Sequence, residues 1–347
     1  MYHARFSGTH YEAGLRWGRA LARRGQFIAK QPTFTVSEER RAFARGCLPA
    51  YREYFPEILE EIRGIAEGQG ADSDDFAAFL FSMYAYGFGH CTCFAYADEN
   101  SAMLGRNSDF LTSLEGLYMN CLYAVDGSRA FNANTTAFAE VEDGMNECGL
   151  AAGLTFVYPE ERGFGLNAGM LVRLILEKCA TAREALGLLC AVPSASQHTI
   201  TVADGSGDIF VAECSPRKIN IVRAEEGKRF VVAANNFFSE EMRGHGSPAG
   251  FDDWNAAGRY GAAGELLTGK TLSPADGRGV LADRRLCGYD RRTGADTVWA
   301  VLYDTKNGRV FRAEGNPSRR AFAEDDRLFS FAAKKRGGVD RRERSAV

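Results

Sequence analysis

A cysteine that opens a predicted β-hairpin is the feature of this sequence best suited to chemistry. The segment GHCTCFAYADENSAMLGRNSDF, at 89–110, begins its first strand at Cys91 and carries Arg106 and Asp109 on its second. A cut between His90 and Cys91 would create an α-amino group, with an unperturbed pKa of about 8, that can take the proton of its own thiol. Arg106 across the hairpin would lower the pKa of that thiol. The pattern therefore predicts an N-terminal cysteine nucleophile whose amine Asp109 orients.

Further motifs accompany this hairpin in a fixed order. The hairpin itself contains C-T-x-F from Cys91 and G-R-N-x-D ending at Asp109. The others are GTHYEAGLRWG at 8–18, G-M-N-E-x-G-L at 144–150, A-N-N-F at 234–237, W-N-x-x-x-R-Y at 254–260 and G-N-P at 315–317. Over nearly its whole length the chain resembles the choloylglycine hydrolase superfamily of N-terminal-nucleophile (Ntn) hydrolases. It is most similar to the isopenicillin-N acyltransferase-like (acyl-CoA:6-aminopenicillanic acid acyltransferase-like) branch.

The resemblance implies roles for the residues around the nucleophile. Cys91 would be both the site of self-cleavage, after His90, and the attacking thiol, with Arg106 and Asp109 beside it. The histidine before the nucleophile and Cys93 two residues after it depart from the family pattern. These departures bear on the efficiency of cleavage and on sensitivity to oxidation.

The resemblance also implies how the oxyanion is held. Asn235 would donate its side-chain amide, although its neighbour Asn236 is an alternative donor. The second donor would be the backbone N–H of Thr155, where many relatives carry asparagine. Arg259 would join the polar network behind the thiolate.

The implied reaction is cleavage of a linear, non-peptide amide C–N bond through an acyl thioester on Cys91. Water as acceptor makes the protein a hydrolase, whereas an amine such as a β-lactam nucleus makes it an acyltransferase. Hydrolysis is favoured because water is always present. The expected partner is a small-molecule acyl amide. The reaction needs no metal or organic cofactor, the leader at 1–90 is expected to stay bound as a second fragment, and homo-oligomerisation is left open.

The expected fold class is α+β, namely a four-layer αββα Ntn-hydrolase sandwich of two antiparallel sheets between helices. An N-terminal helical leader at 1–90 would precede the catalytic domain at 91–332, and a basic tail at 333–347 is expected to be disordered. Beyond the hairpin, strands are expected at 150–157, 199–203, 209–214, 230–234, 297–303 and 309–313, with a helix pair between the first two.

A competing motif is GELLTGKT at 264–271, which satisfies the phosphate-loop pattern and would place Lys270 on a phosphate. Such a loop needs a buried strand before its first glycine and a helix that begins at the lysine. Here the preceding residues look helical, and Pro274 follows soon after. The sequence context therefore disfavours a nucleotide site.

A cysteine–histidine dyad and a non-enzymatic scaffold are also compatible with the sequence. His198 or His245 could serve as the base of a dyad with Cys91, although the segment around Cys91 lacks the setting of papain-like enzymes. The chain could instead be an inactive binding scaffold whose leader is never removed.

Composition narrows the classes further. The 347 residues carry 42 basic and 45 acidic side chains, a net charge of −3, which gives no sign of nucleic-acid binding. None of the nine cysteines forms a C-x-x-C pair, so neither a disulfide framework nor a zinc site is expected. No apolar run reaches the roughly 20 residues that cross a bilayer. We therefore expect a cytoplasmic protein that binds no membrane.

Overall fold

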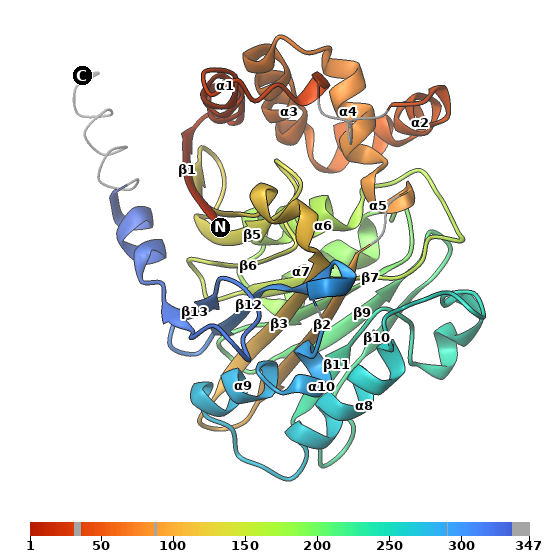
Figure 1. The fold of residues 1–347 in the computed structure, drawn as a ribbon, viewed down its shortest axis with the longest axis vertical. Helices are drawn as coiled ribbons and strands as arrows, with labels where there is room; N and C mark the ends of the chain where they lie inside the picture. Colours follow the sequence, from red (N-terminus) through yellow and green to blue (C-terminus); the bar gives the residue numbers. More distant parts are fainter. Residues whose placement is uncertain (31–35, 87–88, 290, 335–347) are drawn as a thin grey trace.

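Two β-sheets lie face to face at the centre of the computed structural model, which describes residues 1–30, 36–86, 89–289 and 291–334 (Figure 1). In spatial order, sheet A contains β1 (Tyr2–Gly8), β4 (Met119–Val125), β5 (Phe131–Thr135), β6 (Asp143–Asn146), β7 (Ala151–Phe156), β8 (His198–Ala203), β9 (Ile209–Cys214) and β10 (Ile219–Val222). Sheet B contains β11 (Phe230–Ala233), β2 (His90–Ala97), β3 (Ala102–Leu111), β12 (Ala295–Asp304), β13 (Arg309–Ala313) and β14 (Ala323–Glu324).

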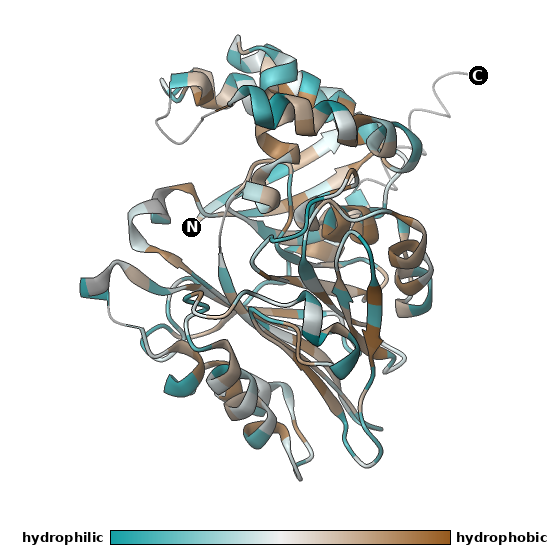
Figure 2. Ribbon diagram, turned by 90° about the vertical axis from the view of Figure 1, so that its right-hand side faces the viewer, coloured by the Kyte–Doolittle hydropathy of each residue, from teal (hydrophilic) through white to brown (hydrophobic). Residues whose placement is uncertain are grey.

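Helices cover the outer faces of both sheets. Those on sheet A are α6 (Ala168–Lys178) and α7 (Ala182–Ala191), and those on sheet B are α8 (Ala256–Leu267), α9 (Pro274–Leu281) and α10 (Arg284–Cys287). Figure 2 shows many hydrophobic residues along the strands between these helices, and both hydrophilic and hydrophobic residues on the helices. The predicted four-layer αββα fold is confirmed.

Strand β2 shows why the sequences of the central strands are nearly continuous runs of apolar residues. Cys93 and Ala95 join the core between the two sheets, while Phe94 and Tyr96 join the core beneath α8 and α9. Because side chains alternate between the two faces of a strand, and both faces are covered, every position of the strand is buried apart from its end. The covered sheet therefore holds Cys91, the second residue of β2, away from solvent.

The leader contains α1 (His10–Ala22), α2 (Glu38–Tyr54), α3 (Pro56–Gln69), α4 (Ser73–Phe81) and α5 (Met83–Tyr86), which gather at one end of the molecule (Figure 1). The prediction of a purely helical leader is wrong at its start, because β1 is a strand that pairs parallel with β4. Phe6 is the one buried residue of β1, so its stability comes from backbone pairing with a distant strand. Pairing with a distant strand cannot be predicted from the local sequence pattern.

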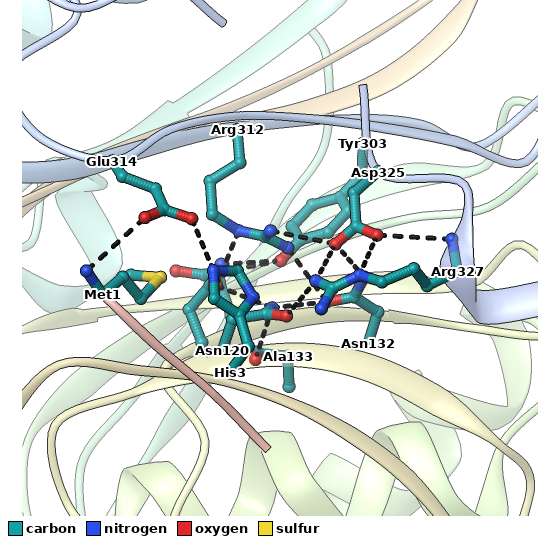
Figure 3. A network of polar contacts seen from close by, with 12 residues as sticks. Met1, His3, Asn120, Asn132, Ala133, Tyr303, Arg312, Glu314, Asp325 and Arg327 are labelled. Atoms are coloured by element: carbon teal, nitrogen blue, oxygen red, sulfur yellow. Dashed lines mark hydrogen bonds and ion pairs between the residues drawn. The ribbon is translucent and has the colours of Figure 1, made fainter. Parts of the chain in front are cut away.

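Polar contacts at the edge of the sandwich tie the chain ends to the two sheets (Figure 3). The Met1 amino group and the His3 ring both contact Glu314, at 3.4 and 2.7 Å. Deeper in the same network, Asp325 accepts hydrogen bonds from Arg312 and Asn132 at 2.9 and 2.8 Å. The start of the chain is thus anchored to Glu314, which directly follows β13. Residues 335–347 of the predicted disordered tail lie outside the described residues.

A buried cluster of four charges joins the leader helices to α6. The His10 ring lies 3.0 Å from Glu61 and 3.3 Å from Glu177. Arg173 binds the same two carboxylates, at 2.7 Å to Glu61 and 2.6 Å to Glu177. Burial acts to lower the pKa of His10, but the hydrogen bonds and charges of the two glutamates raise it to about 9. His10 is therefore a cation at neutral pH, and the cluster is electrically balanced.

We expect this cluster to make stability fall at alkaline pH. Because the pKa of His10 is raised from 6.5 to about 9 on folding, its contribution is complete below pH 6.5 and is lost as the pH rises through 9. The free energy of unfolding should drop by about 2–3 kcal/mol over this range. Urea titrations of the Cys91→Ala chain at pH 6.5 and 9.5 would measure the drop, and adding His10→Gln should remove it. An equal drop with glutamine would contradict this interpretation.

Candidate active site

The Cys91 sulfur lies against the guanidinium of Arg106. In the β2–β3 register Arg106 is opposite Cys93, so its side chain shares a sheet face with Cys91. Nη2 of Arg106 lies 2.7 Å from Sγ of Cys91, and its Nε donates to the carbonyl of Leu154 at 2.8 Å. Nη1 of Arg106 donates to Asp143 at 2.6 Å. A fully buried cation is thus fixed on the predicted nucleophile.

Two glycines make room for this arrangement. A Cβ at Gly153 would lie 3.1 Å from Cδ of Arg106 and 3.3 Å from Sγ of Cys93. A Cβ at Gly105 would lie 2.5 Å from the ring of Phe94. Side chains at these positions would displace Arg106 or the strand that carries it. The glycine of the G-R-N-x-D motif is therefore explained by packing.

The thiol of Cys91 is neutral in the uncleaved chain. Burial raises its pKa to about 12, although the charge of Arg106 acts in the opposite direction. Glu142 also opposes ionisation, because its carboxylate lies 3.1 Å from Nη2 of Arg106 and offsets the positive charge there. Exposure of the site to solvent would remove the desolvation penalty. The pKa of the Cys91 thiol would then fall, and a thiolate could form.

The backbone of Cys91 is held on both sides. Its N–H donates to Oδ1 of Asn235 at 3.0 Å, and its carbonyl accepts from Nη1 of Arg259 at 2.6 Å. Arg259 also donates from Nη2 to Oδ1 of Asn235 at 2.6 Å. Because a guanidinium can only donate, this contact fixes which amide atom of Asn235 faces the nucleophile. The structure brings these three predicted residues together.

The amide nitrogen of Asn235 is occupied by the leader. Its Nδ2 donates to the carbonyl of Gly89 at 3.2 Å and to that of Phe156 at 2.9 Å. Gly89 precedes the predicted cleavage site by one residue. Departure of the leader end would therefore free one N–H of Asn235 beside Cys91.

Asp109 lies on the outer face of sheet B, opposite His90 in the β2–β3 register. It accepts from the hydroxyl of Thr297 at 2.6 Å and from that of Tyr289 at 3.3 Å, and lies 3.6 Å from Arg259. Burial raises its pKa to about 6, against the opposing charge of Arg259. Asp109 is thus linked to the Cys91 backbone through Arg259, which contacts both.

The backbone N–H of Thr155 faces away from the nucleophile in this uncleaved chain. The N–H of Leu154 donates to the carbonyl of Glu142 at 2.9 Å. Because successive N–H groups of a strand point to opposite edges, that of Thr155 points to β8, where Thr199 is its partner in register. The N–H of Phe156 points to the same edge as that of Leu154. An oxyanion role for Thr155 stays a prediction.

A cavity of about 70 Å³ adjoins Cys91. Its lining includes Met83 and Tyr84 of α5, together with His90, Glu142 and Phe156. Ligand sites usually enclose about 300 Å³ or more, so this cavity is too small for a drug-sized substrate. The segment at 1–90 thus forms part of the lining of this cavity.

The phosphate-loop alternative fails on geometry. Residues 264–267 are the last turn of α8, and Gly269 has a φ of 70°, in the left-handed region. Lys270 is exposed and opens no helix, since α9 begins at Pro274. The motif therefore has neither the strand before it nor the helix after it that binding a phosphate requires.

The histidine-dyad alternative is not supported either. The buried ring of His198 lies 3.1 Å from the carbonyl of Ser196, and that of His245 lies 2.8 Å from Glu161. In the described residues no histidine ring is hydrogen-bonded to the Cys91 sulfur. Burial lowers the pKa of His198 to about 4, which suits a structural role better than that of a general base.

Sequence reasoning missed the carboxylates that hold Arg106. Asp143 is fully buried and accepts, besides Arg106, from Trp299 at 3.0 Å and from Tyr303 at 2.7 Å. Glu142 accepts from Thr136 at 2.6 Å. Their position directly before the G-M-N-E motif was the available signal.

The described residues contain no group of three or more His, Cys, Asp or Glu side chains placed to hold a metal ion. Within the same residues, no helix is both long and apolar enough to cross a membrane.

Comparison with known proteins identifies a family for the chain. The family described as acyl-coenzyme A:6-aminopenicillanic acid acyl-transferase matches residues 96–319, more than half of the chain. A penicillin V acylase from Agrobacterium tumefaciens is 18% identical with a TM-score of 0.45, over 65% of this chain and 83% of that one. Two variants of a conjugated bile acid hydrolase from Clostridium perfringens are 14% and 13% identical, with TM-scores of 0.50 and 0.51, over 68% of this chain and 92% of theirs. At such identities the two bile acid hydrolase structures show a shared fold.

Proposed function

Because the chain belongs to the acyl-coenzyme A:6-aminopenicillanic acid acyltransferase family, we propose that it is a self-activated amide hydrolase whose nucleophile is Cys91. Acyl-transfer chemistry follows from the family, and the choice of nucleophile rests on the site. The observation that carries the proposal is the buried contact of 2.7 Å between Sγ of Cys91 and Arg106. Asn235 and Arg259 support it, because they hold the backbone of the same residue.

Activation would begin with attack of the Cys91 thiol on the carbonyl carbon of His90. A carbon–sulfur bond forms, the carbon–nitrogen bond between the two residues breaks, and the thiol proton passes to the departing nitrogen. Water then hydrolyses the thioester, which leaves a carboxylate on His90 and a free thiol and amine on Cys91. The leader, anchored by β1 and by the His10 cluster, would remain bound as a second fragment.

Turnover would use the same atoms on an external amide. The new α-amine takes the thiol proton, the thiolate attacks the substrate carbonyl, and the amine returns the proton to the departing nitrogen. Nδ2 of Asn235, no longer held by Gly89, would stabilise the oxyanion, with a β7 backbone N–H as the second donor. Arg106 would stabilise the thiolate and Asp109 would hold the ammonium form of the amine.

Hydrolase and acyltransferase activity share this acyl-enzyme and differ in the acceptor. We propose hydrolysis, since water is always present, whereas transfer needs a dedicated site for the amine acceptor. Transfer to an amine such as a β-lactam nucleus is the alternative that the family's name favours.

The test is capture of the acyl-enzyme. Purified protein quenched during turnover of a linear acyl amide should carry the acyl mass on the peptide that begins at Cys91. Hydrolysis is supported if the acyl group is released as the free acid and if added 6-aminopenicillanic acid or amino acids do not change the rate of release. Faster release with a new amide product would make it an acyltransferase. Absence of any acyl mass across varied amides would contradict the proposal.

A further inference from the structure

We propose that Trp254 and Tyr289 form a ring slot for the substrate's acyl group, and that the preferred acyl group carries a flat, uncharged ring three carbons from its amide nitrogen. His90 fills this slot in the uncleaved chain. The inference rests on the proposed function and extends it to the class of acyl group.

The slot is defined by ring contacts around His90. The imidazole of His90 is stacked on the indole of Trp254, with ring centroids 3.9 Å apart and an angle of 13° between the planes. The ring of Tyr289 packs in turn on Trp254, with ring centroids 5.3 Å apart and an angle of 52° between the planes. His90 is 3% exposed, whereas Trp254 and Tyr289 are half-buried. Removal of the His90 ring would therefore uncover an aromatic surface beside the nucleophile.

Self-cleavage makes His90 the first acyl group that Cys91 receives. The bond that breaks joins the carbonyl of His90 to the nitrogen of Cys91, so the His90 side chain stands where the acyl part of an external amide would stand. In histidine the ring is separated from the carbonyl carbon by Cα and Cβ. A 3-arylpropanoyl group has the same spacing, which makes it the closest simple mimic of the residue that leaves.

The chemistry of the slot favours an uncharged ring. Burial and the nearby charge of Arg259 lower the pKa of His90 to about 3, so its ring is neutral at physiological pH. Nδ1 of His90 is buried without a hydrogen-bond partner in the described part of the chain. That edge of the slot therefore gains nothing from a polar ring atom, and a phenyl ring would lose no hydrogen bond there.

Trp254 is held at a fixed position relative to Cys91. Trp254 and Asn255 both have left-handed backbone conformations, with φ of 52° and 56°, which is strained for a tryptophan. Arg259 fixes this strained turn, because its Nε donates to the carbonyl of Trp254 at 2.9 Å and its Nη2 to that of Asp253 at 2.9 Å. The same guanidinium binds the carbonyl of Cys91. One side chain thus sets both the nucleophile and the aromatic surface.

The experiment compares three p-nitroanilides with a common leaving group: 3-phenylpropanoyl, 3-cyclohexylpropanoyl and acetyl. The wild type should have a kcat/KM about fivefold or more higher for the phenyl than for the cyclohexyl substrate, because only the flat ring stacks on the indole. Trp254→Leu should lower kcat/KM for the phenyl substrate by about tenfold and change the acetyl value less than threefold. Trp254→Phe should restore most of the phenyl preference. Rates are normalised to the amount of chain that begins at Cys91.

Phe251→Ala is the matched control, since Phe251 lies in the same loop but packs on Tyr158, at 4.4 Å, and should leave the phenyl preference unchanged. Equal wild-type kcat/KM values for the two ring substrates would overturn the inference. So would equal losses of kcat/KM for the phenyl substrate in Trp254→Leu and Trp254→Phe. In either case, turnover of the acetyl substrate would leave the proposed function intact. If Trp254→Leu fails to fold, the preference of the wild type and of Trp254→Phe for the phenyl over the cyclohexyl substrate still tests the inference. Failure of the wild type to accept any of the three acyl groups on Cys91 would overturn both.

Discussion

Replacement of Cys91 by alanine is expected to reduce amide turnover to the uncatalysed rate, a loss of about 10⁶-fold in kcat. Among the described residues, Cys91 is the one cysteine whose sulfur is hydrogen-bonded to the guanidinium of Arg106. In the alanine variant, Arg106 would keep its hydrogen bonds to Asp143 and to the carbonyl of Leu154, which stabilise the fold. The melting temperature of the variant should therefore stay within a few degrees of the wild type. Steady-state assays of both chains with the same anilide measure the effect.

Cys93→Ala is the matched control. Cys93 lies on the same face of β2, two residues further along, and is as deeply buried as Cys91. Its removal should lower stability through lost packing but leave turnover within a few-fold. Substantial turnover by Cys91→Ala, or an equal loss of activity in Cys93→Ala, would move the nucleophile elsewhere.

Asn235→Ala is expected to lower kcat by about 10²- to 10³-fold, the usual cost of one oxyanion donor. Asn235→Asp sharpens the test, because the carboxylate keeps the acceptor that binds Arg259 and the Cys91 nitrogen but has no N–H to donate. Both variants should therefore lose rate.

Asn236→Ala separates the two neighbouring asparagines. Oδ1 of Asn236 accepts from the backbone of Phe237 at 2.9 Å and of Ser247 at 3.1 Å, so it fixes a loop and does not face Cys91. We expect a lower melting temperature with kcat within a few-fold of the wild type. An unchanged rate in Asn235→Ala, or a greater loss in Asn236→Ala, would reverse the assignment.

The parts of the site that could be predicted are local in sequence. Cys91, Arg106 and Asp109 lie on one hairpin, whose alternation and polar turn at 98–101 determine which residues face each other. The strand that carries Thr155 and the strand that ends two residues before Asn235 were also predicted, because their apolar runs are bounded by turn residues. For these elements pattern and structure agree within a few residues.

The parts that could not be predicted depend on contacts between distant segments. Asp143 binds Arg106, Trp299 and Tyr303, which lie on two other strands, and nothing in its local sequence reveals them. Strands β4, β5 and β6 escaped prediction because their buried polar residues, such as Asn120 and Asn134, break the apolar pattern. These asparagines hydrogen-bond one another inside the sandwich, a compensation visible only in three dimensions.

Whether the thiol of Cys91 cuts its own chain can be read from the intact mass of the purified wild-type protein. We expect two fragments, one ending at His90 and one beginning with Cys91, that form without added protease and elute together under native conditions. The Cys91→Ala chain, treated identically, should remain a single species of 38.0 kDa. A wild-type protein that hydrolyses amides while it remains one uncut chain would rule out the α-amine of Cys91 as the catalytic base.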